Sequence, residues 1–191
     1  MSKRFALIAA AAALALAASA AVPLSAAEMA EKTVNVGGAP MYPSKNIIQN
    51  AVNSKDHTTL VAAVKAAGLV DTLSGPGPFT VFAPTNEAFA KLPAGTVDNL
   101  LKPENKEILV KVLTYHVVPG RMTAVNLMKA VKDGEGAAKL KTVAGEDIWV
   151  KQAGPGKLTI TDSKGDVAMV TIADVIQSNG VIHVIDTVLL P

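Results

Sequence analysis

Residues 79–93 read FTVFAPTNEAFAKLP, and this stretch decides the fold. Phe79–Ala83 is a run of apolar and β-branched residues that predicts a buried strand. Pro84–Glu87 then brings hydroxyl, amide and carboxylate side chains, which suit a helix start because their oxygens accept hydrogen bonds from first-turn amides that lack internal partners. Phe89 and Leu92, three residues apart, supply the inward face of that helix. The stretch therefore predicts a strand, a cap and a short helix, and an anion site at the same helix terminus is the alternative interpretation.

The N-terminal residues have the pattern of a secretory signal peptide. Lys3 and Arg4 precede an uncharged apolar run over residues 5–18, and residues 25–27 (SAA) have the small-x-small form of a cleavage site. An uncleaved anchor is the rival interpretation, but a spanning helix needs about 20 strongly apolar residues and this run is short and largely alanine. We therefore expect residues 1–27 to be removed, no transmembrane segment in the mature chain, and a secreted protein that is periplasmic, extracellular or attached to the cell surface.

Charge and cysteine content exclude several classes of function. Loss of the signal peptide removes Lys3 and Arg4 from the 18 basic residues, which leaves 16 Lys and Arg against 16 Asp and Glu. Such a balanced chain carries no general basic footprint for nucleic acid, so we expect no nucleic-acid partner. The absence of cysteine excludes disulfides, thiol chemistry and a cysteine-ligated metal. The remaining length of about 160 residues is enough for one domain with an ordinary hydrophobic core.

The remaining chain is helix-rich in its first part and strand-rich in its last part. Residues 28–44 mix glycine, proline and polar residues without a period, which predicts a flexible leader ahead of a folded domain over residues 45–191. His57–Ala67 predicts a helix ended by Gly68, and Lys106–Thr114 predicts a second one. The apolar stripe of this second helix consists of Ile108, Leu109, Val112 and Leu113. Four short runs rich in valine, isoleucine and threonine then predict strands, at Ile148–Lys151, Leu158–Asp162, Val167–Ala173 and Val181–Ile185. This order indicates an α+β domain.

Three histidines are the candidates for a hydrolytic or metal site. His57 lies at the start of a helix, where we expect it to be solvated. His116 lies where a helical pattern gives way to a strand, and His183 lies in a strand with apolar residues on both faces. A buried neutral imidazole must pair its nitrogens. A hydrogen-bonded core histidine is therefore one interpretation for His116 and His183, and a ligand or catalytic base is the other.

Motifs for catalysis are missing from the sequence. No serine lies in a Gly-x-Ser-x-Gly elbow, and neither a His-Glu-x-x-His motif nor a glycine-rich phosphate loop occurs. We therefore expect no catalytic residues, no cofactor and no metal. Trp149 alternates with Ile148 and Val150, so it faces the other side of its strand. It is either an exposed binding anchor or a cover over the end of the core.

Three stretches resemble the fasciclin (FAS1) domain family. They are FTVFAPTNEAF at Phe79–Phe89, YHVVPG at Tyr115–Gly120, and NGVIHVID at Asn179–Asp186 followed by VLLP at Val188–Pro191. These look like the two signature blocks and the central Tyr-His motif of the family, in the family's order, and the resemblance covers about residues 45–191. The run MYPSKNI at Met41–Ile47 is similar to that of secreted single-domain bacterial members. The resemblance implies an α+β wedge, with a β-sandwich-like core and several helices packed at one side.

The resemblance also implies site residues. In animal members, integrin contact is attributed to the Tyr-His region and to an Asp-Ile pair before the second block. The matching positions are Tyr115, His116, Asp174 and Val175, with valine in place of isoleucine. A tyrosine at a helix-to-strand junction can also bury its ring while its hydroxyl finds a backbone acceptor, so a core role for Tyr115 and His116 stays open. The motif residues expected to be structural are Thr85, Asn86, Phe89, His183 and Asp186.

The expected function follows from the resemblance, the export signal and the missing catalytic motifs. We expect a secreted, non-enzymatic adhesion module that makes weak contacts with a protein or with an envelope or matrix polymer. The alternative is an envelope protein that binds a small molecule or a metal through His116 or His183.

Overall fold

The computed structural model describes residues 32–191. The predicted signal peptide, residues 1–27, lies outside the described residues, as do residues 28–31 of the predicted leader. Within residues 32–191 no helix combines the length and the apolar character needed to cross a membrane.

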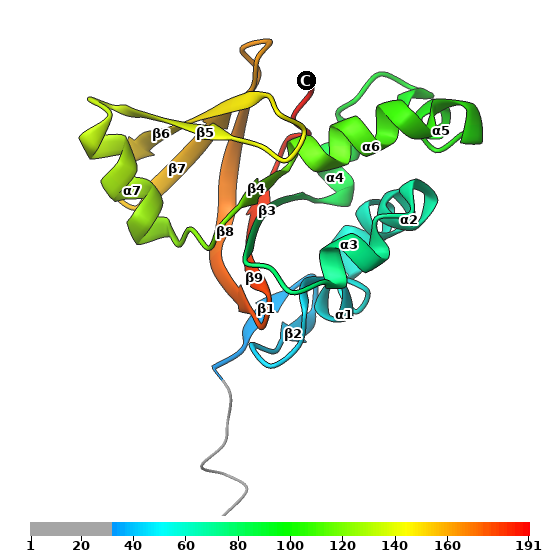
Figure 1. Cartoon of the computed structure of the whole chain (residues 1–191), viewed down its shortest axis with the longest axis horizontal. Helices are drawn as coiled ribbons and strands as arrows, with labels where there is room; N and C mark the ends of the chain where they lie inside the picture. The colour runs from blue at the N-terminus through cyan, green and yellow to red at the C-terminus, as the bar shows by residue number, and fades with distance from the viewer. Residues whose placement is uncertain (1–31) are drawn as a thin grey trace, which may run out of the picture. The chain divides into compact units, whose positions relative to one another are not determined.

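A seven-stranded mixed sheet forms the centre of the protein, in the order β4-β3-β9-β8-β7-β6-β5 (Figure 1). Its strands are β3 (Phe79–Pro84), β4 (Val117–Pro119), β5 (Ala137–Lys141), β6 (Asp147–Gly154), β7 (Lys157–Thr161), β8 (Val167–Gln177) and β9 (Gly180–Ile185). β3 pairs with β9 in parallel, and the other pairs are antiparallel. The amide of Val143, just after β5, donates to Val117 O of β4 at 2.8 Å, so the two ends of the sheet meet.

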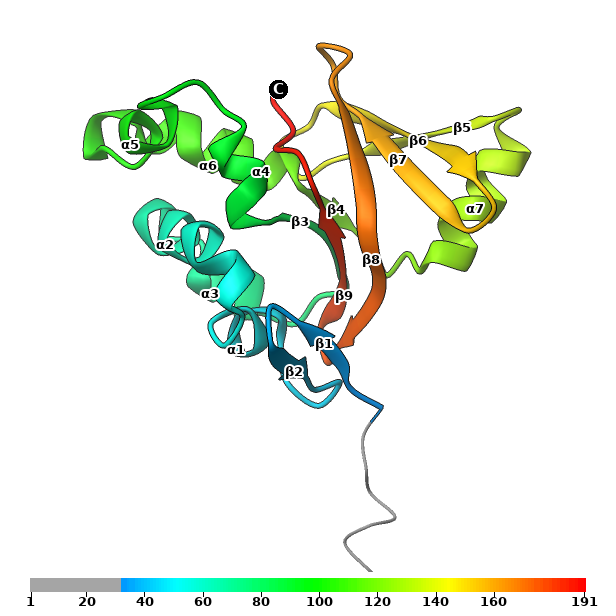
Figure 2. The same ribbon diagram turned by 180° about the vertical axis from the view of Figure 1, so that it is seen from behind.

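The helices lie in two groups, as Figures 1 and 2 show from opposite sides. The first group is α1 (Ile47–Ala51), α2 (Thr58–Ala67), α3 (Val70–Ser74), α4 (Asn86–Ala90), α5 (Thr96–Leu100) and α6 (Lys106–Tyr115), with short 3-10 turns at Lys55–His57 and Pro103–Asn105. Helix α7 (Ala124–Asp133) is separate from them and packs on β5 and β6. The expected α+β architecture with several helices at one side is confirmed.

Two hydrophobic clusters lie on opposite faces of the central strands. Val81 and Ala83 of β3 belong to the cluster under the first helix group, whereas Phe82 belongs to the cluster under α7. Such alternation is what a strand covered on both faces requires. All six residues of β9 are buried as well. The central strands β3 and β9 are therefore enclosed on both faces.

The prediction of a flexible leader up to residue 44 is wrong for the part that the structure describes. β1 (Val34–Val36) and β2 (Ala39–Met41) form an antiparallel hairpin, and Val36 and Met41 are buried in the first cluster. Gly37 and Gly38 have φ of 60° and 75°, which is the geometry of a two-residue hairpin turn. The same two glycines indicated a break in the chain when the sequence was considered alone.

The predicted helices and strands are confirmed in kind. Gly68 ends α2 in the left-handed conformation with φ 74°, as expected for a glycine after a helix. Leu109, Val112 and Leu113 of α6 are buried, but Ile108 is 55% exposed, so the buried stripe is narrower than predicted. Helices α1, α3, α5 and α7 and strand β5 were not predicted.

Candidate functional site

The three motif stretches come together as neighbouring strands. β3 and β9 pair in register from Phe79 with Gly180 to Pro84 with Ile185, and β4 pairs with the other edge of β3. Tyr115 and His116 lie directly before β4. The polar residues of all three motifs are therefore close enough to form one site, and their hydrogen bonds decide whether they do.

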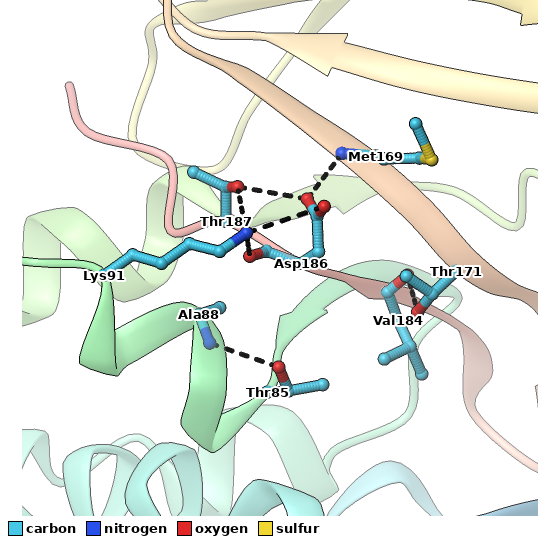
Figure 3. Close-up of polar contacts among 8 residues, drawn as sticks. All are labelled: Thr85, Ala88, Lys91, Met169, Thr171, Val184, Asp186 and Thr187. Atoms are coloured by element: carbon cyan, nitrogen blue, oxygen red, sulfur yellow. Dashed lines mark hydrogen bonds and ion pairs between the residues drawn. The ribbon is translucent and has the colours of Figure 1, made fainter.

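Thr85 and Asn86 cap two different helices. Thr85 Oγ1 accepts from the amide of Ala88 at 3.2 Å and so caps α4 (Figure 3). Asn86 Oδ1 instead accepts from the amide of Thr59 at 3.0 Å, at the start of the neighbouring helix α2. Its Nδ2 donates to Lys55 O at 2.8 Å. Both polar side chains are used to start helices, as predicted for the cluster, although the role of Asn86 in a second helix could not be seen from the sequence.

Asp186, directly after β9, connects the end of this strand by hydrogen bonds to neighbouring segments (Figure 3). Its Oδ1 accepts from the amide of Met169 at 2.8 Å and from Thr187 Oγ1 at 3.0 Å, and Lys91 Nζ donates to the Asp186 carbonyl at 2.6 Å. Partial burial alone would raise the pKa of the Asp186 carboxyl. The hydrogen bonds from Met169 and Thr187, together with the Lys91 charge, lower this pKa below its ordinary value.

Tyr115 and His116 are core residues in this structure, 0% and 2% exposed. The Tyr115 hydroxyl donates to Asp147 O at 3.0 Å and accepts from the amide of Ser163 at 3.0 Å. His116 Nδ1 donates to Val112 O at 2.8 Å, and its Nε2 accepts from the amide of Leu189 at 3.0 Å. Burial lowers the pKa of His116 to about 4, so the ring is neutral. Neither side chain presents a surface that a partner could contact.

His183 and Asp174 are linked to each other. His183 Nε2 donates to Met122 O at 2.8 Å, and its Nδ1 accepts from the amide of Asp174 at 3.3 Å. Its ring stacks on Phe82 with centroids 5.7 Å apart, and burial lowers its pKa. Asp174 sits at a bulge of β8 with φ 57°, and its Oδ1 accepts from the amide of Ala124 at 2.6 Å, at the start of α7. Asp174 therefore joins the bulge, His183 and α7.

The contact pair implied by the resemblance is only partly available at the surface. Val175 is 1% exposed and belongs to the first cluster, whereas Asp174 is partly exposed. Three of the four implied contact residues, Tyr115, His116 and Val175, are thus enclosed. The expectation that these three side chains touch a partner is not compatible with the structure.

His57 is also buried, so the expectation that it is solvated is wrong. It is 3% exposed, and its Nδ1 lies 2.9 Å from Ser54 Oγ. It lines a small cavity together with Val36 and Met41 of the unpredicted hairpin. Burial lowers its pKa. The hairpin is the physical reason for the difference, because its residues Val36 and Met41 line the same cavity as the His57 ring.

The described residues contain no group of three His, Asp or Glu side chains that could hold a metal ion. Both ring nitrogens of His116 and of His183 are engaged by backbone groups. An imidazole in that state has no lone pair for a metal, since ligation needs one free nitrogen. The geometry therefore gives no support to the alternative that uses these two histidines.

Sequence reasoning missed two polar residues with large structural roles. Asn179 Oδ1 accepts from the amide of Ile47 at 3.0 Å, and its Nδ2 donates to Leu73 O at 2.8 Å. Asp162 is 2% exposed, and its carboxylate accepts from the amides of Asp166 at 2.9 Å and Leu190 at 3.0 Å. Asn179 directly precedes Gly180, and Asp162 lies three residues before Gly165. These glycines indicate turns but not the distant hydrogen-bond partners of the two side chains.

Comparisons with known proteins agree with this fold. A family model described as Fasciclin domain matches residues 55–191. Protein sll1483 of Synechocystis sp. is 50% identical over 172 residues, which are 89% of this chain and 87% of that protein. Immunogenic protein MPB70 of Mycobacterium bovis is 36% identical over 146 residues, 74% of this chain and 66% of that protein. The solved FAS1 domain pair of the insect cell adhesion molecule fasciclin I is similar with a TM-score of 0.69 and 20% identity, over 85% of this chain and 59% of that one.

Proposed function

Because this chain belongs to the fasciclin (FAS1) domain family, we propose that it is a non-enzymatic binding module, which makes weak adhesive contacts with a protein or with a polymer of the cell envelope or matrix. One observation carries the proposal. The polar side chains of the motif strands are hydrogen-bonded to the protein's own backbone, and the histidines and Tyr115 among them are buried. A general base or nucleophile needs a free position directed at a substrate.

We further propose that the mature protein is exported and acts outside the cytoplasm. The arrangement of the first 27 residues supports this. The solved structure that is similar to this chain at 20% identity comes from a cell adhesion molecule. Adhesion is a property of that protein, and we carry it to this chain as a proposal.

Retention on cells and envelope material tests the proposed function. The mature chain, beginning at residue 28, is labelled and applied to intact cells and to immobilised envelope extract. We expect saturable retention that unlabelled protein competes away. Absence of retention on every preparation would refute the adhesion function.

The variant Tyr115→Phe separates a core role from a contact role in the same assay. A core role predicts lower stability but normal retention at a temperature where the variant is folded. Loss of retention at unchanged stability would instead mean that the hydroxyl contacts the partner, against the burial of this side chain.

A further inference from the structure

The sheet formed by β5, β6, β7 and the first part of β8 has one face without a helix. On its inward face Ile148, Val150, Leu158 and Ile160 are fully buried below α7. Figures 1 and 2 show α7 on one side of these strands only. We call the opposite side the outer face; its strand residues are Lys139, Lys141, Asp147, Trp149, Lys151, Lys157, Thr159, Thr161, Val167 and Met169. Val167 is 54% and Met169 42% exposed, so solvent reaches this face.

The strand register arranges the outer face in rows. One row runs from Lys139 through Trp149 and Thr161 to Val167, and the next row contains Lys151, Thr159 and Met169. Adjacent strands lie about 4.8 Å apart, so the first row spans about 14 Å. Trp149 is partly exposed within it, with lysine and threonine as its cross-strand neighbours. The result is a solvent-facing sheet surface, the platform, with an indole near its middle and hydroxyl and ammonium groups around it.

The outer face is positively charged although the mature chain is balanced. Four lysines lie on its strands, Lys139, Lys141, Lys151 and Lys157, against a single carboxylate, Asp147. Asp147 Oδ2 is 2.9 Å from Lys139 Nζ, so its charge is already paired. The remaining lysines have no ion pair among residues 32–191. A partner that complements this face must be acidic.

The platform continues into a hollow of about 380 Å³, lined among others by Lys157, Met169 and Thr171. It lies where β7 and β8 separate, because β8 pairs with β7 only at Val167–Met169 and then continues along β9. A linear ligand lying across the rows would enter this hollow at one end. A long, shallow surface of this kind fits a chain molecule better than a compact small molecule, since small-molecule sites are deep and enclosed.

We propose that the outer face binds an acidic polysaccharide, with a sugar ring stacked on Trp149, its hydroxyl groups bonded to Thr159 and Thr161, and its acidic groups facing Lys151 and Lys157. A protein partner is disfavoured because lysine is depleted at the core of protein interfaces, whereas aromatic residues and arginine are enriched there. The outer face has one aromatic residue, four lysines and no arginine. This proposal names the ligand class of the binding module described above and rests on that function.

The single tryptophan of the chain makes the test direct. Oligogalacturonate and dextran sulfate serve as carboxylated and sulfated probes, and neutral dextran serves as the uncharged control. We expect a saturable change in Trp149 emission with at least one acidic probe, weakened by salt, and none with neutral dextran. Equal responses to the neutral and acidic polymers would overturn the proposal. So would binding of single-stranded DNA or of anionic vesicles in the absence of sugar binding, because the partner would then be of another class.

Variants locate the site by affinity electrophoresis, which needs no fluorophore. We expect Lys151→Glu and Trp149→Ala each to weaken binding of the acidic probe by about fivefold. The matched control Lys129→Glu, with the same charge change on the exposed side of α7, should keep the natural affinity apart from a small effect of net charge. Equal weakening by Lys129→Glu and Lys151→Glu would contradict a local site.

The two proposals fail in different ways. If cells retain the Lys151→Glu and Trp149→Ala variants as well as the natural chain, the adhesion function stands and the outer face is not its site. If cells do not retain the natural chain, the adhesion function itself fails, whatever the sugar-binding result.

Discussion

His116 shows how a single buried residue connects packing to pH. Its ring donates to Val112 O and accepts from the Leu189 amide, and this pattern exists only for the neutral form. Burial lowers its pKa from 6.5 to about 4. The ring therefore fixes the end of α6 to the C-terminal segment as long as it stays unprotonated.

Acid should destabilise the protein before its carboxylates titrate. Between pH 6.5 and 4 the unfolded chain binds a proton at His116 that the folded chain does not, so stability falls as the pH falls, by about 3 kcal/mol from His116 alone. The pKa values of His57 and His183 are lowered in the same direction and add to the effect. Urea unfolding at pH 7.5, 6, 5 and 4.5 measures this loss. If the free energy of unfolding stayed constant between pH 7.5 and 5, the histidines would not be buried in the neutral form. In the His116→Gln variant the free energy of unfolding should depend less steeply on pH.

The Tyr115 hydroxyl should matter for stability. Tyr115→Phe leaves the Ser163 amide and the Asp147 carbonyl without this partner, which should cost about 1–3 kcal/mol. Tyr42→Phe is a matched control, because Tyr42 is partly exposed and makes its side-chain contact with Lys45 through its ring. The urea midpoints of the two variants give the comparison. If both substitutions lowered the midpoint equally, the buried hydrogen bonds of the Tyr115 hydroxyl would not contribute to stability.

At the scale of elements, helix starts depend on residues outside the helix. Asn86 belongs to α4 by sequence, yet its Oδ1 accepts from the Thr59 amide in the first turn of α2. Asn86→Ala should therefore destabilise the protein by about 1–2 kcal/mol, and more than a cap of one helix alone, because Lys55 O loses its donor as well. The control is Asn126→Ala, because Asn126 is an exposed asparagine on α7. Thermal unfolding of the two variants measures the difference in stability. If Asn86→Ala left the stability unchanged, water would replace these hydrogen bonds without loss of free energy.

The β1–β2 hairpin should behave as part of the domain. A chain that begins at residue 45 loses the burial of Val36 and Met41, which should cost about 3–6 kcal/mol, and it exposes His57 to water. Comparison with the chain that begins at residue 28, by urea unfolding and by NMR titration of His57, tests both effects. Equal stability of the two chains would restore the interpretation of residues 34–41 as a leader.

The sequence predicted correctly those elements whose structure depends on residues close to them in the chain. The strand-cap-helix of residues 79–92 and the four late strands follow from periodicity and turn residues, and the motif resemblance supplied the family. It failed where the cause is distant. The side chains that enclose His57 come from a hairpin with only three residues per strand, too short to show a period. Trp149 was correctly placed on the other face of its strand from Ile148. The positive charge around it, however, depends on the pairing of four separate strands, and the composition of the chain does not reveal that pairing.

At the scale of the whole molecule, two hydrophobic clusters share one set of central strands. β8 contributes Val175 to the first cluster and Ala168 to the second, and β9 contributes Ile182 and Ile185 to different clusters in the same way. Disruption of one cluster therefore also destabilises the strands that carry the residues of the other cluster.

Unfolding should be a single cooperative transition in spite of the two clusters. Trp149 fluorescence reports on the sheet under α7, and far-ultraviolet circular dichroism reports mainly on the six helices of the other group. We expect the two signals to change together in urea, as two-state unfolding requires. Separate midpoints would mean that the clusters are independent units.

The parallel pairing of β3 and β9 has a mechanical consequence. β9 lies between β3 and β8 and is hydrogen-bonded along its length to both. A pulling force that reaches β9 from Asp186 acts along the strand axis, so the bonds on both edges are sheared together instead of being unzipped one after another. Resistance to such a load is governed by the rate of forced rupture, not by equilibrium stability. For the adhesive role proposed above, this geometry means that the fold should withstand loads that break the weak contacts with a partner.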